Sequence, residues 1–176
     1  CESPATAVLL TIKSTSSAPV SSDETICSGE ATPDLTATGA SPQWYSDAGL
    51  TTLEATGSPF ATGETAIGTY TYYVTDLVNG CESNSTTVVL TIKDIPAITS
   101  ETPTDQTLCD SGDGQIVIAA TGIATLNYSI DNGTSYQASG TFNGLSSGSY
   151  TVKVKNGNGC ELAGSTLDVQ DGPSPA

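Results

Sequence analysis

Apolar and polar side chains alternate along several segments of the chain with a period of two residues. The pattern is clearest at residues 70–75, 88–93 and 150–155, where every second side chain is apolar. A two-residue period predicts β-strands with one buried and one exposed face. We therefore expect the buried faces of these segments to be formed by Tyr70, Tyr72, Val74, Val88, Leu90, Ile92, Tyr150, Val152 and Val154.

Turn dipeptides separate the alternating segments, and no stretch has the period of an amphipathic helix. Asn followed by Gly favours the positive φ angles of tight hairpins. Such pairs occur at Asn79-Gly80, Asn132-Gly133, Asn143-Gly144, Asn156-Gly157 and Asn158-Gly159. Many short strands joined by tight turns predict an all-β fold, made of small immunoglobulin-like β-sandwich modules in tandem.

A sequence pattern recurs after about 80 residues. The triplet Cys-Glu-Ser, followed by an apolar run and Lys, occurs at 1–13 and again at 81–93. A looser copy relates residues 68–82 to residues 148–161, where Gly-x-Tyr-Thr leads to Asn-Gly-Cys-Glu. A module of about this length is therefore repeated along the chain.

Clusters of Pro and Ser mark the predicted boundaries of the modules. Pro fixes φ and removes a backbone donor, so connectors that contain it should be extended and stiff. We predict the last strand of an upstream module at 1–13, a linker at 14–22, an immunoglobulin-like module at 23–93, a linker at 94–104, a second module at 105–171 and the start of a linker at 172–176. The first segment could complete a neighbouring module by donating its strand.

Four of the five cysteines bracket the two complete modules. Cys27 and Cys81 are 54 residues apart, and Cys109 and Cys160 are 51 apart. This spacing predicts one disulfide bond in each module, which would stabilise it by roughly 4 kcal/mol on the chain-entropy model. Cys1 takes the position of Cys81 in an upstream module, and its partner is left open. A thiol nucleophile or a metal thiolate is the alternative, but the chain has neither His nor Cys-x-x-Cys to support it.

Composition argues against several classes of function. The chain has 4 Lys and Arg against 19 Asp and Glu, a net charge of −15, which is unsuited to nucleic acid or an anionic membrane. Without His or Met it lacks the usual general base and common metal ligands, and we predict that it is not an enzyme. No apolar stretch reaches the roughly 18 to 20 residues of a membrane span.

Two sets of motifs resemble known families. The first module resembles the Ig-like domains of large secreted Bacteroidota proteins through Ile26-Cys27-Ser28-Gly29, Gln43-Trp44-Tyr45 and Gly80-Cys81-Glu82-Ser83. The second module resembles the SprB repeat of gliding-motility adhesins through Cys109-Asp110, Tyr128-Ser129-Ile130-Asp131, Phe142-Asn143-Gly144-Leu145 and Asn158-Gly159-Cys160. It departs from that family at Gly122-Ile123, where the family has Gly-Gly.

The resemblance implies a giant protein that is exported by the type IX secretion route and is extracellular or held at the cell surface. We therefore predict a non-catalytic repeat segment that forms a stalk or filament used in adhesion or surface motility. Its expected partners are other modules of the same protein, with self-association into fibres. The alternative is a carbohydrate-binding or accessory module of a secreted adhesin or polysaccharide-degrading enzyme, with surface glycans as ligands.

Three local features suggest more specific roles. Trp44 is predicted to lie in the core against the cystine of its module, as in immunoglobulin domains. Tyr73 lies on the outward phase of its strand and is the candidate for contact with a glycan. Asp110 and Asp113 could supply carboxylate oxygens to Ca²⁺, the only cofactor that we consider, although their spacing is not that of a D-x-D-x-D-G loop and also suits a structural turn.

Overall fold

The computed structural model describes residues 7, 9 and 11–174, and their regular elements are all β-strands. The chain forms two compact units. Unit 1 comprises residues 1–25 and 31–91, and unit 2 comprises residues 26–30 and 92–176. No helix that could span a membrane occurs in the described part of the chain. The prediction of an all-β fold is confirmed.

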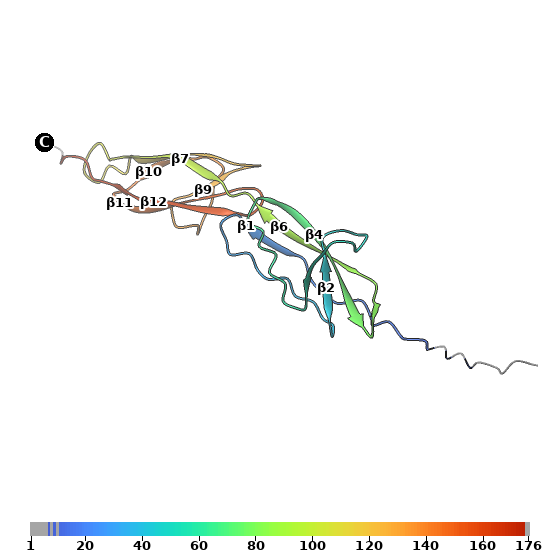
Figure 1. The fold of residues 1–176 in the computed structure, drawn as a ribbon. Helices are drawn as coiled ribbons and strands as arrows, with labels where there is room; N and C mark the ends of the chain where they lie inside the picture. The colour runs from blue at the N-terminus through green and yellow to red at the C-terminus, as the bar shows by residue number, and fades with distance from the viewer. Residues whose placement is uncertain (1–6, 8, 10, 175–176) are drawn as a thin grey trace, which may run out of the picture. The chain divides into compact units, whose positions relative to one another are not determined.

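Unit 1 is built on one mixed sheet (Figure 1). Its strands follow the order β1-β6-β4-β2-β3, and the short β5 folds back on β4. In chain order they are β1 (Glu24–Cys27), β2 (Pro42–Tyr45), β3 (Leu53–Thr56), β4 (Gly68–Val78), β5 (Cys81–Glu82) and β6 (Thr86–Lys93). The turn between β4 and β5 has positive φ at Asn79 and Gly80, as the Asn-Gly pair predicts.

The core of unit 1 is aromatic. Trp44 is fully buried, and its indole Nε1 donates a hydrogen bond to the carbonyl oxygen of Gly57 at 2.8 Å. The Phe60 ring lies 5.3 Å from the rings of both Trp44 and Tyr72. The prediction that Trp44 is a core residue is confirmed. Its ring packs against Phe60, and the core cluster to which both belong does not include the cystine.

Unit 2 is a sandwich of two three-stranded sheets. One sheet has the order β10-β8-β7 and the other β12-β11-β9, and Figure 1 shows them as two layers. The strands are β7 (Ala97–Thr104), β8 (Gly114–Thr121), β9 (Asn127–Ser129), β10 (Thr141–Leu145), β11 (Gly148–Lys155) and β12 (Glu161–Val169). Its core includes the two valines predicted to point inward from β11, and consists of Ile116, Ile118, Val152, Val154 and Val169.

Two predicted linkers are parts of the folded units. Of the linker predicted at 94–104, residues 97–104 form β7. This strand lies at the end of its sheet, where Pro103, which has no backbone N–H, can be accommodated. Within 14–22, the Val20 carbonyl accepts a hydrogen bond from the Thr38 N–H in unit 1, and the Val20 N–H donates to the Thr38 hydroxyl oxygen. Of the strand predicted at 1–13, residues 1–6, 8 and 10 lie outside the described residues, and residues 11–13 are not in a strand.

Candidate functional site

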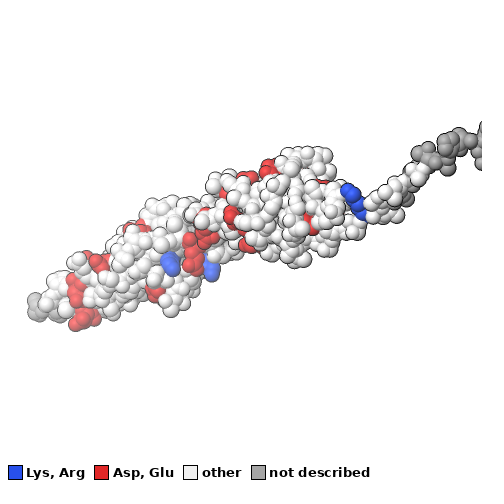
Figure 2. Space-filling view, turned by 60° about the horizontal axis from the view of Figure 1, so that its bottom comes forward, with Lys and Arg blue, Asp and Glu red and all other residues white. Residues whose placement is uncertain are grey.

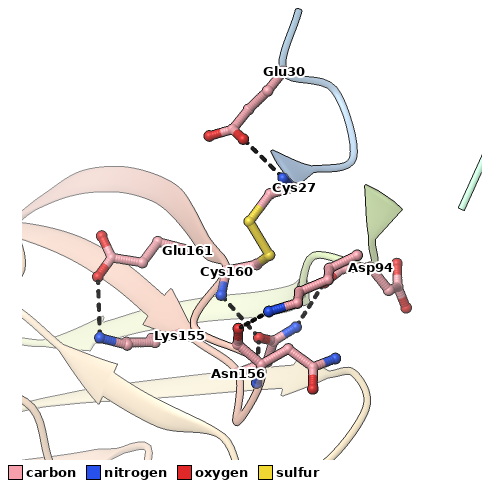
Figure 3. Close-up of a disulfide and its surroundings, with 9 residues drawn as sticks. Cys27, Glu30, Asp94, Lys155, Asn156, Cys160 and Glu161 are labelled. Atoms are coloured by element: carbon pink, nitrogen blue, oxygen red, sulfur yellow. Dashed lines mark hydrogen bonds and ion pairs between the residues drawn. A yellow bond between two sulfur atoms is a disulfide. The ribbon is translucent and has the colours of Figure 1, made fainter. Parts of the chain in front are cut away.

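One disulfide bond joins residues that are far apart in the sequence. Cys27 at the end of β1 is bonded to Cys160, which precedes β12, across 133 residues (Figure 3). Their Cα atoms are 5.7 Å apart, within the range that a disulfide needs. Cys160 is buried, and the backbone N–H of Cys27 donates to the Glu30 carboxylate at 2.8 Å. Both cysteines therefore lie in ordered surroundings within unit 2.

Asn156 organises the hairpin that carries Cys160. Its side chain is fully buried, and its Oδ1 accepts hydrogen bonds from the N–H groups of Asn158 and Cys160, both at 3.1 Å. Its Nδ2 donates to the carbonyl oxygen of Asp94 at 2.8 Å (Figure 3). The sequence indicated Asn156 only as half of an Asn-Gly turn, and no sequence signal distinguished it from the other four pairs.

The predicted bond between Cys27 and Cys81 is wrong, because strand direction separates the two residues. The bonds from Val89 N–H to Asp23 and from Ser28 N–H to the Lys93 carbonyl show that β1 and β6 run in the same direction. Cys27 therefore lies where β6 ends. Cys81 lies in the hairpin that precedes β6, at the other end of that strand, and is a free thiol.

The predicted bond between Cys109 and Cys160 is wrong for a similar reason. Cys160 precedes β12, whereas the N–H of Cys109 donates to the carbonyl oxygen of Pro173, beyond the end of that strand. The nine residues of β12 span roughly 30 Å at about 3.3 Å each. Cys109 is consequently an exposed free thiol.

The charges around Cys109 disfavour its thiolate. Asp110 and Asp171 place carboxylate oxygens near its sulfur, and all three potential ligand atoms lie within 4.8 Å of one another. The negative charge of Asp110, above all, raises the pKa of the Cys109 thiol. A raised pKa argues against a nucleophilic or metal-binding thiolate at this position.

The candidate calcium residues have different surroundings. Asp113 accepts bonds from Thr107 N–H at 3.0 Å, from Thr107 Oγ1 at 2.6 Å and from the Ser111 hydroxyl. These donors, Ser111 first, lower the pKa of Asp113 to about 2. Asp110 groups instead with Cys109 and Asp171. Calcium binding by Asp110 and Asp113 stays a prediction. The Asp113 carboxylate accepts hydrogen bonds from residues of its own loop, as a structural turn requires.

Tyr73, the candidate for glycan contact, is half-buried on β4. It lies opposite Tyr45 of β2, whose hydroxyl donates to Glu82 and whose pKa is raised to about 12, mainly by burial. A groove elsewhere in unit 1 is lined by small or aliphatic side chains, namely Val20, Ser21, Ser22, Thr36, Ala37 and Thr38. That groove lacks the aromatic surfaces on which sugars stack, and glycan contact at Tyr73 stays a prediction.

The surface charge agrees with the composition. On the face drawn in Figure 2, few basic side chains stand among many acidic ones. Lys153 and Lys155 lie 3.9 and 3.8 Å from carboxylate oxygens of Glu161, so both cations are already paired. Their pairing leaves no cluster of unpaired cations there that could bind a polyanion.

Part of the chain is similar to a known protein family. Residues 16–93 match the family described as "Ig-like domain CHU_C associated". No curated protein matches the chain. Among solved structures, extracellular domains 3–5 of Drosophila OTK are similar, with 16% sequence identity and a TM-score of 0.31, over 86% of this chain and 63% of that chain. A TM-score of 0.31 does not establish a shared fold.

The match of residues 16–93 to an Ig-like family model agrees with the strands of unit 1 and with the resemblance of its motifs. The SprB-like character of residues 105–171 stays a prediction.

Proposed function

We propose that the chain is a non-catalytic structural segment of a large extracellular or cell-surface protein, in which tandem modules form a stalk or filament for adhesion or surface motility. The observation that carries this proposal is the disulfide bond between Cys27 and Cys160. In the sequence the first cysteine belongs to one module and the second to the next, so the bond ties successive modules together covalently.

Such a bond has a mechanical consequence. A chain pulled from its ends transmits force through the disulfide. The segment between its two cysteines, which are 133 positions apart, cannot be stretched while the bond is intact. At about 3.4 Å per residue, roughly 450 Å of chain is withheld from extension. A load-bearing stalk benefits from this protection, whereas a soluble binding module has no comparable need for it.

The proposal includes export to an oxidising compartment, by the type IX route that the sequence resemblance implies. Disulfide bonds persist outside the reducing cytosol, and small sandwich modules with thin cores gain most from them. The proposed partners are other modules of the same protein. The strands at the ends of the sheets, such as β3, are edges through which fibres could associate laterally.

Force spectroscopy on the 176-residue chain, pulled from its two ends, tests this function. The oxidised chain should show no unfolding event that releases the withheld length. The Cys27→Ser variant should release about 450 Å more chain, because the bond no longer shields the modules. Cys81→Ser is the matched control, since Cys81 is a free thiol, and it should behave as the parent.

Equal extension of the oxidised parent and of Cys27→Ser would contradict the load-bearing function. Specific binding of the chain to a set of surface polysaccharides, lost on Tyr73→Ala, would instead support the carbohydrate-binding alternative.

A further inference from the structure

The two cysteines of the disulfide bond occupy different positions of the sequence repeat. Each module carries one cysteine near its start, Cys27 or Cys109, and one near its end, Cys81 or Cys160. We call these the start and end cysteines. The bond joins the start cysteine of one module to the end cysteine of the next. Among the described residues, this pairing leaves Cys81 and Cys109 without a partner, and both are free thiols.

The surroundings of Cys81 repeat those of Cys160. Before Cys160, the Lys93 ammonium donates to the carbonyl oxygen of Asn158 at 3.4 Å. Before Cys81, the Lys13 ammonium donates to the carbonyl oxygen of Asn79 at 2.7 Å. Lys13 and Lys93 are equivalent positions of the 80-residue repeat, and both Asn residues precede the Gly-Cys of an end cysteine. The chain that enters each module thus passes the turn beside its end cysteine in the same way.

The surroundings of Cys109 likewise repeat those of Cys27. Both lie in a short turn that contains residues with positive φ, Gly29 in the first case and Asp110 and Gly112 in the second. In both turns a backbone N–H bonds to the chain that leaves the module. Ser28 N–H donates to the Lys93 carbonyl at 2.7 Å, and Cys109 N–H donates to the Pro173 carbonyl at 3.2 Å.

We propose that Cys81 and Cys109 are half-sites of two further disulfide bonds between modules. Cys81 pairs with the start cysteine of the module before it, and Cys109 pairs with the end cysteine of the module after it. The inference rests on the proposed function, since it needs modules in tandem. It turns a single bond into a continuous series of covalent links in which every module is joined to both neighbours.

Each bond forms by exchange with a disulfide oxidant, such as oxidised glutathione or an oxidised dithiol enzyme. One cysteine thiolate attacks the oxidant, releasing one of its thiols and forming a mixed disulfide. The thiolate of the partner cysteine then displaces the second thiol. Two protein thiols thus lose two protons and two electrons, the protein S–S bond forms, and the S–S bond of the oxidant is reduced to two thiols.

Disulfide mapping of the full-length exported protein tests the inference. Free thiols are alkylated in denaturant without reductant, the protein is cleaved with a glutamyl endopeptidase, and linked peptides are identified by mass spectrometry. We expect peptides containing Cys81 and Cys109 to be unalkylated, each linked to a peptide from another module. In the 176-residue chain alone, both should be alkylated completely.

A substitution in the full-length protein provides a second readout. Cys109→Ser should leave the end cysteine of the following module free, so that one further thiol per molecule becomes alkylated and can be assigned by its peptide. Ser111→Ala, in the same turn, is the control and should add none.

Alkylated Cys81 or Cys109 in the full-length protein would overturn the inference, as would a bond from either residue to a cysteine of the same type. If the Cys27–Cys160 peptide is present while Cys81 and Cys109 are alkylated, only this inference fails. If the Cys27–Cys160 peptide is absent as well, the proposed function loses the observation that carries it.

Discussion

At the scale of single residues, short polar side chains close the loops of unit 2 through local hydrogen bonds. Asp113 holds the loop that contains Cys109 by accepting bonds from Thr107 and Ser111. Asp131 closes the loop after β9 in the same manner, with bonds from the N–H and hydroxyl of Ser135 at 2.9 and 2.5 Å. These donors favour the ionised carboxylates, so the pKa of each is lowered to about 2.

The lowered pKa of Asp113 predicts a loss of stability in acid. Its pKa is about 2 in the folded chain and about 3.8 when unfolded, so the unfolded chain binds the proton first. The contribution of Asp113 is therefore complete above about pH 4 and is lost as the pH falls towards 2. In Asp113→Asn, the decline of the urea midpoint between pH 4 and pH 2 should be shallower than in the parent.

The control for this prediction is Asp34→Asn, since Asp34 is exposed and accepts no hydrogen bond from a described residue. It should follow the pH profile of the parent. Identical profiles for Asp113→Asn and the parent would show that the loop bonds do not favour the carboxylate.

At the scale of elements, the direction of the strands decides which cysteines meet. The parallel pairing of β1 with β6 places Cys27 where the first module ends, and the hairpin between β11 and β12 presents Cys160. Asn156 closes that hairpin, since its N–H donates to the Cys160 carbonyl at 3.0 Å and its side chain takes up three further bonds. A buried polar group that loses its hydrogen-bond partner lowers the stability of the folded state.

Asn156→Ala should lower the free energy of unfolding of unit 2 by about 2 to 3 kcal/mol, because the truncation leaves the buried N–H of Cys160 and the partly buried carbonyl of Asp94 without partners. Chemical denaturation followed by far-UV circular dichroism measures the change. Asn158→Ala is the matched control, because Asn158 is exposed and bonds through its backbone, and it should cost less than about 0.5 kcal/mol. Similar costs for the two variants would contradict the role given to Asn156.

At the scale of the whole molecule, two hydrophobic cores and one disulfide bond that closes a long loop stabilise the fold. Trp44 and its aromatic neighbours support unit 1, and the valines of β11 with the isoleucines of β8 support unit 2. The disulfide bond restricts the unfolded chain over a separation of 133 residues. In the chain-entropy model, a loop of this length removes more entropy from the unfolded state than a bond within one module would.

Cys27→Ser should therefore reduce the stability of the oxidised chain by roughly 4 to 5 kcal/mol. Guanidinium unfolding measures the effect, with the fluorescence of the single Trp reporting on unit 1 and circular dichroism on the whole chain. Cys81→Ser, the same chemical change at a free thiol, should leave both transitions in place. A Cys27→Ser chain within 1 kcal/mol of the parent would show that the unfolded state gains little entropy when the bond is removed.

The sequence by itself determined the local structure of this protein. Alternating apolar residues predicted the buried faces of β6 and β11, and Asn79-Gly80 predicted the turn between β4 and β5. Strand faces and tight turns depend on residues that are close together in the sequence, and the periodicity of apolar residues indicates which face of a strand is buried. Composition misled at Pro103, which suggested a linker, although a strand at the edge of a sheet can contain a proline.

Only the tertiary structure decided which cysteines are bonded. Spacing along the chain favoured pairs within each module, but a disulfide needs Cα atoms about 4.4 to 6.8 Å apart, and that distance depends on the direction of whole strands. Because β1 runs parallel to β6, Cys27 and Cys81 lie at opposite ends of β6. Cys109 and Cys160 lie at opposite ends of β12, which is nine residues long. Neither is a local property of the sequence, so the bond from Cys27 to Cys160 became visible only in the folded chain.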